Sequence, residues 1–174
     1  MTDSARALHA TQLTPDEVER ILRVCGTDAL LVGGQALAAW AVHYDIQPIG
    51  QLSRAVTMDV DFIGTSDVAH ALQRALGQPW KLRKGTLDDV GGQVAKVYAK
   101  TMDGIKQVDF LSGIVGLDTE VVCKRATEVT LPDGVAVNVL HPLDVLESRL
   151  RNLDSIPAKR DATGVAQARL AVSV

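Results

Sequence analysis

The stretch that decides the fold of this chain is Thr57-Met58-Asp59-Val60-Asp61-Phe62, which follows an apolar run ending in Val32-Gly33-Gly34. Side chains alternate between the two faces of a β-strand, so Asp59 and Asp61 share one face, about 7 Å apart. Two like charges held on one face repel each other unless a cation lies between them. Mg²⁺ takes one or two carboxylates together with water and phosphate oxygens. The alternative is a solvated edge strand whose acids face water.

The composition indicates one soluble domain. The chain has 174 residues, of which 47% are hydrophobic and 22% are charged, enough to build a core. A formal charge of −3 argues against nucleic-acid binding through bulk electrostatics, but it is compatible with a local basic patch. The two isolated cysteines predict neither a disulfide framework nor a zinc site. No apolar run approaches a membrane span and no signal peptide is visible, so we expect a cytoplasmic protein without a membrane partner.

The order of predicted elements indicates an α/β fold with a mixed β-sheet flanked by helices. A capping box with proline at the first helical position starts a helix at Thr14-Pro15-Asp16-Glu17. Further helices are predicted at 35–44, from Ser66 and from Pro142, and strands at 28–32, 57–63, 80–84, 93–100, 105–111, 126–131 and 135–140. We expect residues 1–140 to form the α/β domain and residues 141–174 to form a short C-terminal helical segment packed on it.

A third acid, Asp109, lies between apolar neighbours in Gln107-Val108-Asp109-Phe110-Leu111. If this strand pairs beside the strand of Asp59 and Asp61, three carboxylates meet on one sheet face. Such a group can hold two Mg²⁺ ions about 4 Å apart. The alternative is an exposed acid on an amphipathic strand.

The Gly33-Gly34 turn lies between a predicted strand and a predicted helix. Glycines let the backbone approach a phosphate closely, and the N-terminus of the following helix offers free N–H groups. The spacing matches neither a Walker A loop nor a dinucleotide-binding fingerprint. The alternative is a tight connection without a ligand.

Together these motifs resemble the nucleotidyltransferase superfamily that includes DNA polymerase β. The segments 33–37 and 54–61 resemble the abortive-infection toxin nucleotidyltransferases of bacterial toxin–antitoxin systems, as do His141-Pro142-Leu143-Asp144 and Lys159-Arg160-Asp161 more loosely. The resemblance covers roughly residues 28–161. Gly34 stands where many members have a serine, and Arg149 lies where the toxin relatives often have a lysine.

The resemblance implies a Mg²⁺-dependent enzyme that transfers a nucleoside monophosphate from a nucleoside triphosphate to a hydroxyl group. It implies that Asp59 and Asp61 bind two metal ions, while Asp109 binds the catalytic one and helps deprotonate the acceptor. The residues that it implies around the nucleotide are Gly33, Gly34, Gln35, Arg54, Thr57 and Lys159.

Several acceptors and roles are open at this point. The resemblance favours a toxin or defence component that modifies an RNA 3′ end or a protein side chain, and a small-molecule acceptor is a further alternative. The rival interpretation is a non-catalytic member of the same fold that binds nucleotide or a protein partner, such as an antitoxin or an assembly subunit.

Overall fold

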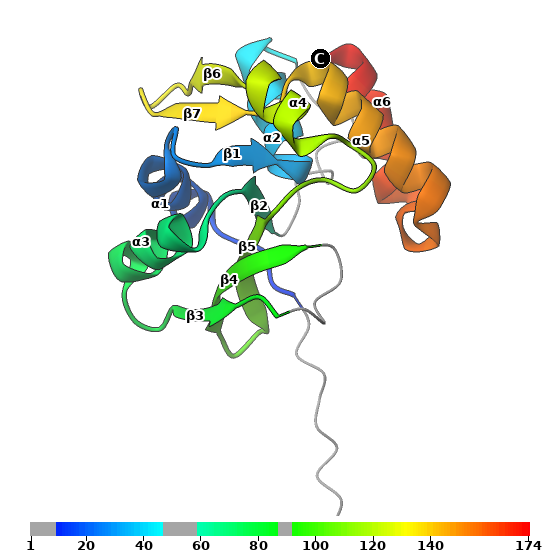
Figure 1. Cartoon of the computed structure of the whole chain (residues 1–174). Helices are drawn as coiled ribbons and strands as arrows, with labels where there is room; N and C mark the ends of the chain where they lie inside the picture. The colour runs from blue at the N-terminus through cyan, green and yellow to red at the C-terminus, as the bar shows by residue number, and fades with distance from the viewer. Residues whose placement is uncertain (1–9, 47–58, 87–91) are drawn as a thin grey trace, which may run out of the picture.

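The computed structural model describes residues 10–46, 59–86 and 92–174. Its centre is a seven-stranded mixed sheet with the strand order β3-β4-β5-β2-β1-β7-β6 (Figure 1). The strands are β1 (Leu30–Val32), β2 (Val60–Ile63), β3 (Lys81–Lys84), β4 (Gln93–Lys100), β5 (Ile105–Leu111), β6 (Thr127–Thr130) and β7 (Ala136–Val139). The predicted mixed sheet is therefore confirmed.

Helices flank the sheet. They are α1 (Pro15–Cys25), α2 (Gly33–His43), α3 (Ser66–Leu76), α4 (Thr119–Arg125), α5 (Pro142–Ser155) and α6 (Ala162–Ser173), with a 3-10 turn η2 (Pro157–Lys159). Helices α1 and α3 contact each other, whereas α5 and α6 pack together and against α2 (Figure 1). None of the described helices combines the length and the apolarity needed to cross a membrane.

Local sequence signals place most helix starts. The capping box at α1 is present: the Glu17 backbone N–H donates to Thr14 Oγ1 at 3.3 Å, and the Glu17 carboxylate accepts from the Thr14 N–H at 2.8 Å. Thr65, rather than Ser66, caps α3. Helix α4 is an element that the sequence patterns do not predict, although Asp118 caps it by accepting from the Val121 N–H.

The register of the sheet fixes which residues share a face. Strand β2 lies between β1, which is antiparallel to it, and β5, which is parallel. Phe62 and Phe110 are paired on one face, where their rings stack 5.6 Å apart and are almost fully buried. Because neighbours along a strand point to opposite faces, the acidic residues of β2 and β5 must lie on the other face.

Helix α5 has polar side chains buried and leucines exposed. Leucines recur along α5 at positions 143, 146, 150 and 153. Leu143 and Leu150 are 61% and 53% exposed, whereas Ser148 and Arg149 are buried. Burying polar side chains is costly unless they find partners, so a helix that does so typically contributes them to a site or a network.

Candidate functional site

The structure brings the three predicted acids to neighbouring strands. Asp61 and Asp109 are direct partners in the register of the parallel pair β2–β5, and Asp59 directly precedes β2. Asp59 and Asp61 are two residues apart, so all three carboxylates belong to the same side of the sheet. The sequence analysis required the strand of Asp109 to pair beside the strand of Asp59 and Asp61, and the structure shows this pairing.

A cavity of about 290 Å³ opens beside this face. Asp59, Asp61 and the turn Gly33–Gly34 form one wall. The other lining residues come mainly from the C-terminal helices and the loop after β5: Gly113, Ile114, Val115, Ser148, Arg149, Asn152, Lys159 and Gln167. The cavity therefore has an acidic side on the sheet and a basic, amide-rich side on the helices.

Asp61 is electrostatically the most perturbed of the three acids. Burial, followed by the charges of Asp109 and Asp59, raises the pKa of Asp61 to about 6, and the opposing charges of Arg149 and Lys159 offset only part of this. Burial also raises the pKa of Asp59, although a hydrogen bond from Gln107 lowers it in part. A group of carboxylates that raise one another's pKa is the electrostatic signature of a cation site.

Asp109 is held by polar neighbours of the same sheet. Lys96 Nζ lies 3.3 Å from Asp109 Oδ1, and the amide groups of Gln93 and Gln107 donate to the two carboxylate oxygens. Burial nevertheless raises the pKa of Asp109, with the Asp59 charge adding to the effect and Lys96 opposing it. Asp109 is not among the residues that line the cavity, and it has the positive charge of Lys96 already beside it.

Gly33 is required by the close approach of the turn to Asp61. Its φ is +68°, in the left-handed region, and a Cβ at this position would lie 2.5 Å from Asp61 Oδ2. A real Cβ does not come this close to an oxygen, so any other residue would displace the carboxylate or the turn. This turn opens α2, an eleven-residue helix whose N-terminus carries no side-chain cap.

The chemistry of the donor set fits a divalent cation such as Mg²⁺. Asp59 and Asp61 offer carboxylate oxygens to the cavity, and hard cations of this kind prefer oxygen ligands. Within residues 10–46, 59–86 and 92–174, no group of three or more His, Cys, Asp or Glu side chains is already gathered around one metal position. Asp59 and Asp61 would be the first ligands, with Asp109 as the third acid beside them.

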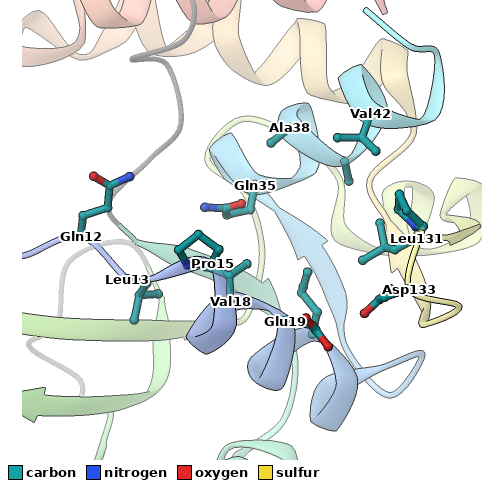
Figure 2. A pocket seen from close by; sticks show the side chains of 13 residues that line it. Gln12, Leu13, Pro15, Val18, Glu19, Gln35, Ala38, Val42, Leu131 and Asp133 are labelled. Carbon is teal, nitrogen blue, oxygen red and sulfur yellow. The ribbon is translucent and has the colours of Figure 1, made fainter. Parts of the chain in front are cut away.

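The remaining predicted site residues divide into three cases. Lys159 lies at the cavity, on η2. The Gln35 side chain is buried at a different, apolar groove between α1 and α2, as Figure 2 shows, so only its backbone belongs to the glycine turn. Arg54 and Thr57 lie outside the described residues.

The apolar groove of about 470 Å³ at Gln35 is larger than the site cavity. Leu13, Val18 and Val42 are among its lining residues (Figure 2). Its charged lining residues, Glu19 and Asp133, are both ion-paired to Arg23. The groove therefore lacks the converging reactive groups of the acidic cavity.

The sequence identifies only part of the helical side of the cavity: the resemblance includes Lys159 and notes the position of Arg149, but not Ser148, Asn152 or Gln167. Ser148, Arg149 and Asn152 occupy consecutive turns of α5, but in sequence they lie between leucines that suggest an apolar contact face. The usable signal is the spacing of polar residues at i, i+1 and i+4, which puts them on one side of a helix. Gln167 comes from α6, whose weak amphipathicity gives no such signal.

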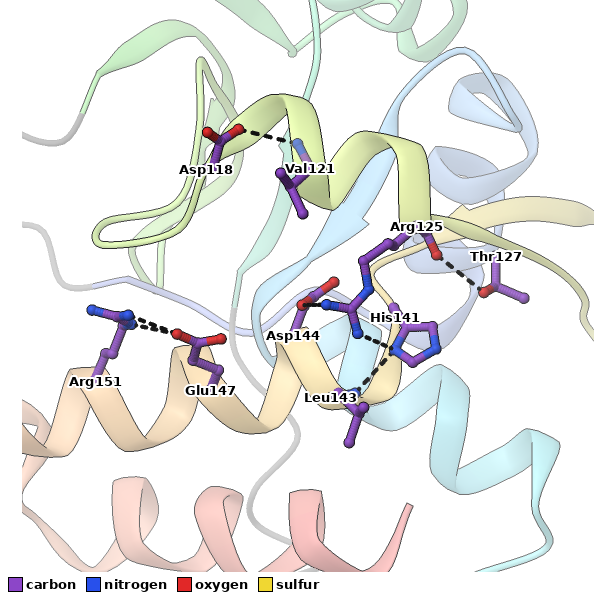
Figure 3. A network of polar contacts seen from close by, with 9 residues as sticks. All are labelled: Asp118, Val121, Arg125, Thr127, His141, Leu143, Asp144, Glu147 and Arg151. Atoms are coloured by element: carbon purple, nitrogen blue, oxygen red, sulfur yellow. Dashed lines mark hydrogen bonds and ion pairs between the residues drawn. The ribbon is translucent and has the colours of Figure 1, made fainter.

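Helix α5 is tied to α4 at its first turn (Figure 3). Arg125 Nη1 lies 3.0 Å from Oδ1 of Asp144, whose side chain is only 4% exposed. His141 caps the helix, since its Nδ1 accepts from the Leu143 N–H at 3.3 Å, and the same nitrogen faces Arg125 Nη2. These contacts set the position of the helix that carries Ser148 and Arg149.

Comparison with known proteins gives structural similarity only. No protein-family model and no curated protein sequence matches the chain. Among solved structures, it is similar to the Megavirus polyadenylate synthase, with a TM-score of 0.48 and 15% identity over 99% of this chain. It is also similar to a candidate nucleotidyltransferase from H. pylori, with a TM-score of 0.43 and 11% identity, covering 92% of this chain and 95% of the other. The chain spans 37% of the length of the polyadenylate synthase. At these identities, neither similarity says which reaction this chain performs.

Proposed function

We propose that this chain is a Mg²⁺-dependent nucleotidyltransferase, which moves a nucleoside monophosphate from a nucleoside triphosphate to a hydroxyl acceptor. The observation that carries the proposal is the pairing of Asp61 with Asp109 across β2 and β5, with Asp59 on the same face and the Gly33–Gly34 turn at the same cavity. The sequence resemblance to nucleotidyltransferases rests on these same residues.

The acids and the turn have separate roles in this proposal. Asp59 and Asp61 would hold Mg²⁺, which when bound neutralises the developing charge on the phosphates. The backbone N–H groups of Gly33, Gly34 and Gln35 bind phosphate oxygens at the start of α2. Arg54, Thr57 and Lys159 are proposed as further contacts to the nucleotide.

Asp109 is the proposed base. The acceptor oxygen bonds to the α-phosphorus, the bond from that phosphorus to the bridging oxygen breaks, and pyrophosphate leaves with the electron pair. The acceptor proton passes to the Asp109 carboxylate. Its raised pKa suits this task, because a base works best when its pKa is close to the working pH.

One observation favours a second candidate, a non-catalytic domain that binds nucleotide or a protein partner. Asp109 is engaged by Lys96, Gln93 and Gln107. A catalytic Asp109 would have to exchange at least one of these partners when metal and substrate bind. For the first candidate, the nucleotidyltransferase, we propose an RNA 3′ end or a protein side chain as the acceptor. We propose a toxin or defence role in the cytoplasm for the same candidate.

The test is a transfer assay with each labelled nucleoside triphosphate and Mg²⁺, with and without total RNA. We expect label on RNA or on protein with the wild type, and loss of at least about a hundredfold in rate with Asp59→Asn or Asp109→Asn. The matched control is Asp103→Asn, which changes an exposed acid of the β4–β5 turn. Nucleotide binding without transfer in the wild type would instead support the non-catalytic candidate.

A further inference from the structure

Strands β3 and β4 form a basic edge on a chain of net negative charge. The formal charge of the chain is −3, yet both strands contain Lys or Arg and neither contains Asp or Glu. Lys81, Arg83 and Lys100 of these strands are exposed. A local patch of this kind attracts a polyanion even when the net charge of the protein does not.

The register divides the side chains of β3 and β4 between the two faces of the sheet. Lys81 pairs with Tyr98 and Arg83 pairs with Lys96, so these four side chains share one face. Lys84 lies on the other face, where α3 packs against both strands (Figure 1). The exposed cations of the first face are therefore directed away from α3.

One row of side chains connects this basic edge to the acids of the site. The successive partners across β3, β4, β5 and β2 are Arg83, Lys96, Asp109 and Asp61. Neighbouring strands are about 4.8 Å apart, so β3 lies about 10 Å from β5. Asp109 is the proposed base for the acceptor hydroxyl. A polymer whose terminal hydroxyl meets Asp109 can therefore reach the cations of β3 within its last few units.

The cations of this row repel each other when no ligand is bound. Arg83 and Lys96 are direct cross-strand partners, and like charges in this arrangement destabilise a sheet. Lys96 Nζ lies 3.3 Å from Asp109 Oδ1. Burial raises the pKa of Asp109, and the charges of Lys96 and Arg83 lower it in part. Two cations thus act on one carboxylate, which leaves an excess of positive charge toward the open face.

Tyr98 adds an aromatic ring to the same face. It is half-buried on β4, with Lys81 as its cross-strand partner and Lys100 two residues further along the strand. Cations that follow a backbone, together with a ring on which a base can stack, are typical of surfaces that bind single-stranded nucleic acid. An acidic peptide would match the charge of these side chains but would have no base to stack on the ring.

We infer that this basic face, formed by Lys81, Arg83, Tyr98 and Lys100, binds the single-stranded end of an RNA acceptor and directs its terminal hydroxyl to Asp109. The inference rests on the proposed nucleotidyl transfer and selects RNA from the two proposed acceptors. The three cations bind phosphate groups, and Tyr98 stacks on a base.

The experiment measures the binding of a short, fluorescently labelled single-stranded RNA of mixed sequence to the full chain, by anisotropy at several salt concentrations. The decisive variant combines Lys81→Gln with Lys100→Gln. We expect it to weaken binding roughly tenfold and to reduce the slope of log affinity against log salt by about 1.4, or about 0.7 for each phosphate contact that is lost. Arg83 is left in place, because it donates to Gln93, which itself donates to Asp109.

The matched control is Lys84→Gln, which makes the same change of charge on the same strand but on the other face. It should stay within about twofold of the wild type in affinity. Tyr98→Leu should weaken binding at least about fivefold, whereas Tyr98→Phe keeps the ring and should bind like the wild type. The Tm of each variant shows that it is folded.

Three results would overturn the inference: a wild type that does not bind RNA, an unchanged affinity in the Lys81→Gln and Lys100→Gln variant, or an equal loss with Lys84→Gln. The two proposals fail separately. RNA binding through Lys81 and Lys100 without nucleotidyl transfer would contradict the enzyme. Transfer of label to protein that depends on Asp59, but not on these lysines, would contradict only the RNA surface and would identify protein as the acceptor.

Discussion

Asp61 lies where burial and two neighbouring acids raise its pKa to about 6, from an ordinary value of 3.8. A carboxyl group whose pKa is higher in the folded than in the unfolded protein binds its proton more tightly in the fold. The free energy of unfolding therefore falls as the pH rises from about 4 to about 6, and the penalty persists above that range. The residue destabilises the metal-free protein at neutral pH, as expected of a group kept for function.

Asp61→Asn should accordingly stabilise the metal-free protein. Removing a penalty of about 2–3 kcal/mol should raise the Tm in EDTA by roughly 5–10 °C at about pH 8, with the gain shrinking toward zero at about pH 4. Differential scanning calorimetry at both pH values measures this. Mg²⁺ should stabilise the wild type more than the variant. A lower Tm for Asp61→Asn at about pH 8 would mean that Asp61 is a structural partner and not a cation ligand.

Gly33 and Gly134 offer a matched pair of substitutions. Both have a positive φ, +68° and +81°, but a Cβ on Gly134 would meet nothing within 4 Å, whereas one on Gly33 would strike Asp61. Gly134→Ala should cost about 1 kcal/mol in backbone strain, and Gly33→Ala roughly 1–3 kcal/mol more together with most of the transfer activity. Urea unfolding and the transfer assay measure the two effects. Equal costs for the two variants would contradict the proposed close approach.

At the scale of elements, the ion pair between Arg125 and Asp144 joins α4 to α5 (Figure 3). Asp144 is buried, so Arg125→Gln should leave an uncompensated charge and cost about 2–4 kcal/mol of unfolding free energy. Adding Asp144→Asn to Arg125→Gln should restore a large part of the lost free energy of unfolding. A double-mutant cycle by urea unfolding gives the coupling energy. Additive effects would show that the helices are not joined through this pair.

A second inter-element pair links α1 to β5, where Lys106 Nζ lies 2.7 Å from a carboxylate oxygen of Glu17. Burial alone would raise the pKa of Glu17. The hydrogen bonds and charge of Lys106, together with the Thr14 cap, outweigh this effect and hold the pKa below its ordinary value of 4.5. The pair therefore stabilises the protein above about pH 4.5 and loses its effect as the pH falls below that value.

Lys106→Met should thus cost about 1 kcal/mol near pH 7 and close to nothing near pH 3. Urea unfolding of both proteins across this range measures the difference. Lys124→Met, which removes a highly exposed pair with Glu120, is the control and should change the free energy of unfolding by less than about 0.5 kcal/mol. A pH-independent cost for Lys106→Met would indicate lost packing and not lost charge.

Short-range chemistry explains which elements could be predicted. The strands at 93–100 and 105–111 were predicted with their observed bounds, because apolar alternation and the Asp103-Gly104 turn are local signals. Helix α4 was missed, since seven residues with one buried side chain have too little periodicity. Ser148, Asn152 and Gln167 were missed for a different reason: they come together only when α5 and α6 pack on α2, and the spacing of polar residues within α5 does not show which element that side of the helix faces.

In the molecule as a whole, the cavity is lined jointly by the sheet with its Gly33–Gly34 turn, by the loop after β5 and by the C-terminal helices. The acids could be assigned to one face from sequence because β2 and β5 have clear alternation, and their parallel pairing confirms the condition. The division into residues 1–140 and 141–174 stays a prediction. Since Arg149, Lys159 and Gln167 belong to the second part, the proposed enzyme needs both parts.

The most direct test of nucleotidyl transfer is to follow a nucleoside triphosphate labelled at the α-phosphate beside one labelled at the γ-phosphate. We predict that with Mg²⁺ the α-label becomes attached to RNA or protein, while the γ-label is released in pyrophosphate. Asp61→Asn should abolish the attachment and Asp103→Asn should preserve it. Release of the γ-label as inorganic phosphate without attachment of the α-label, or attachment that persists in Asp61→Asn, would contradict the proposed reaction and its site.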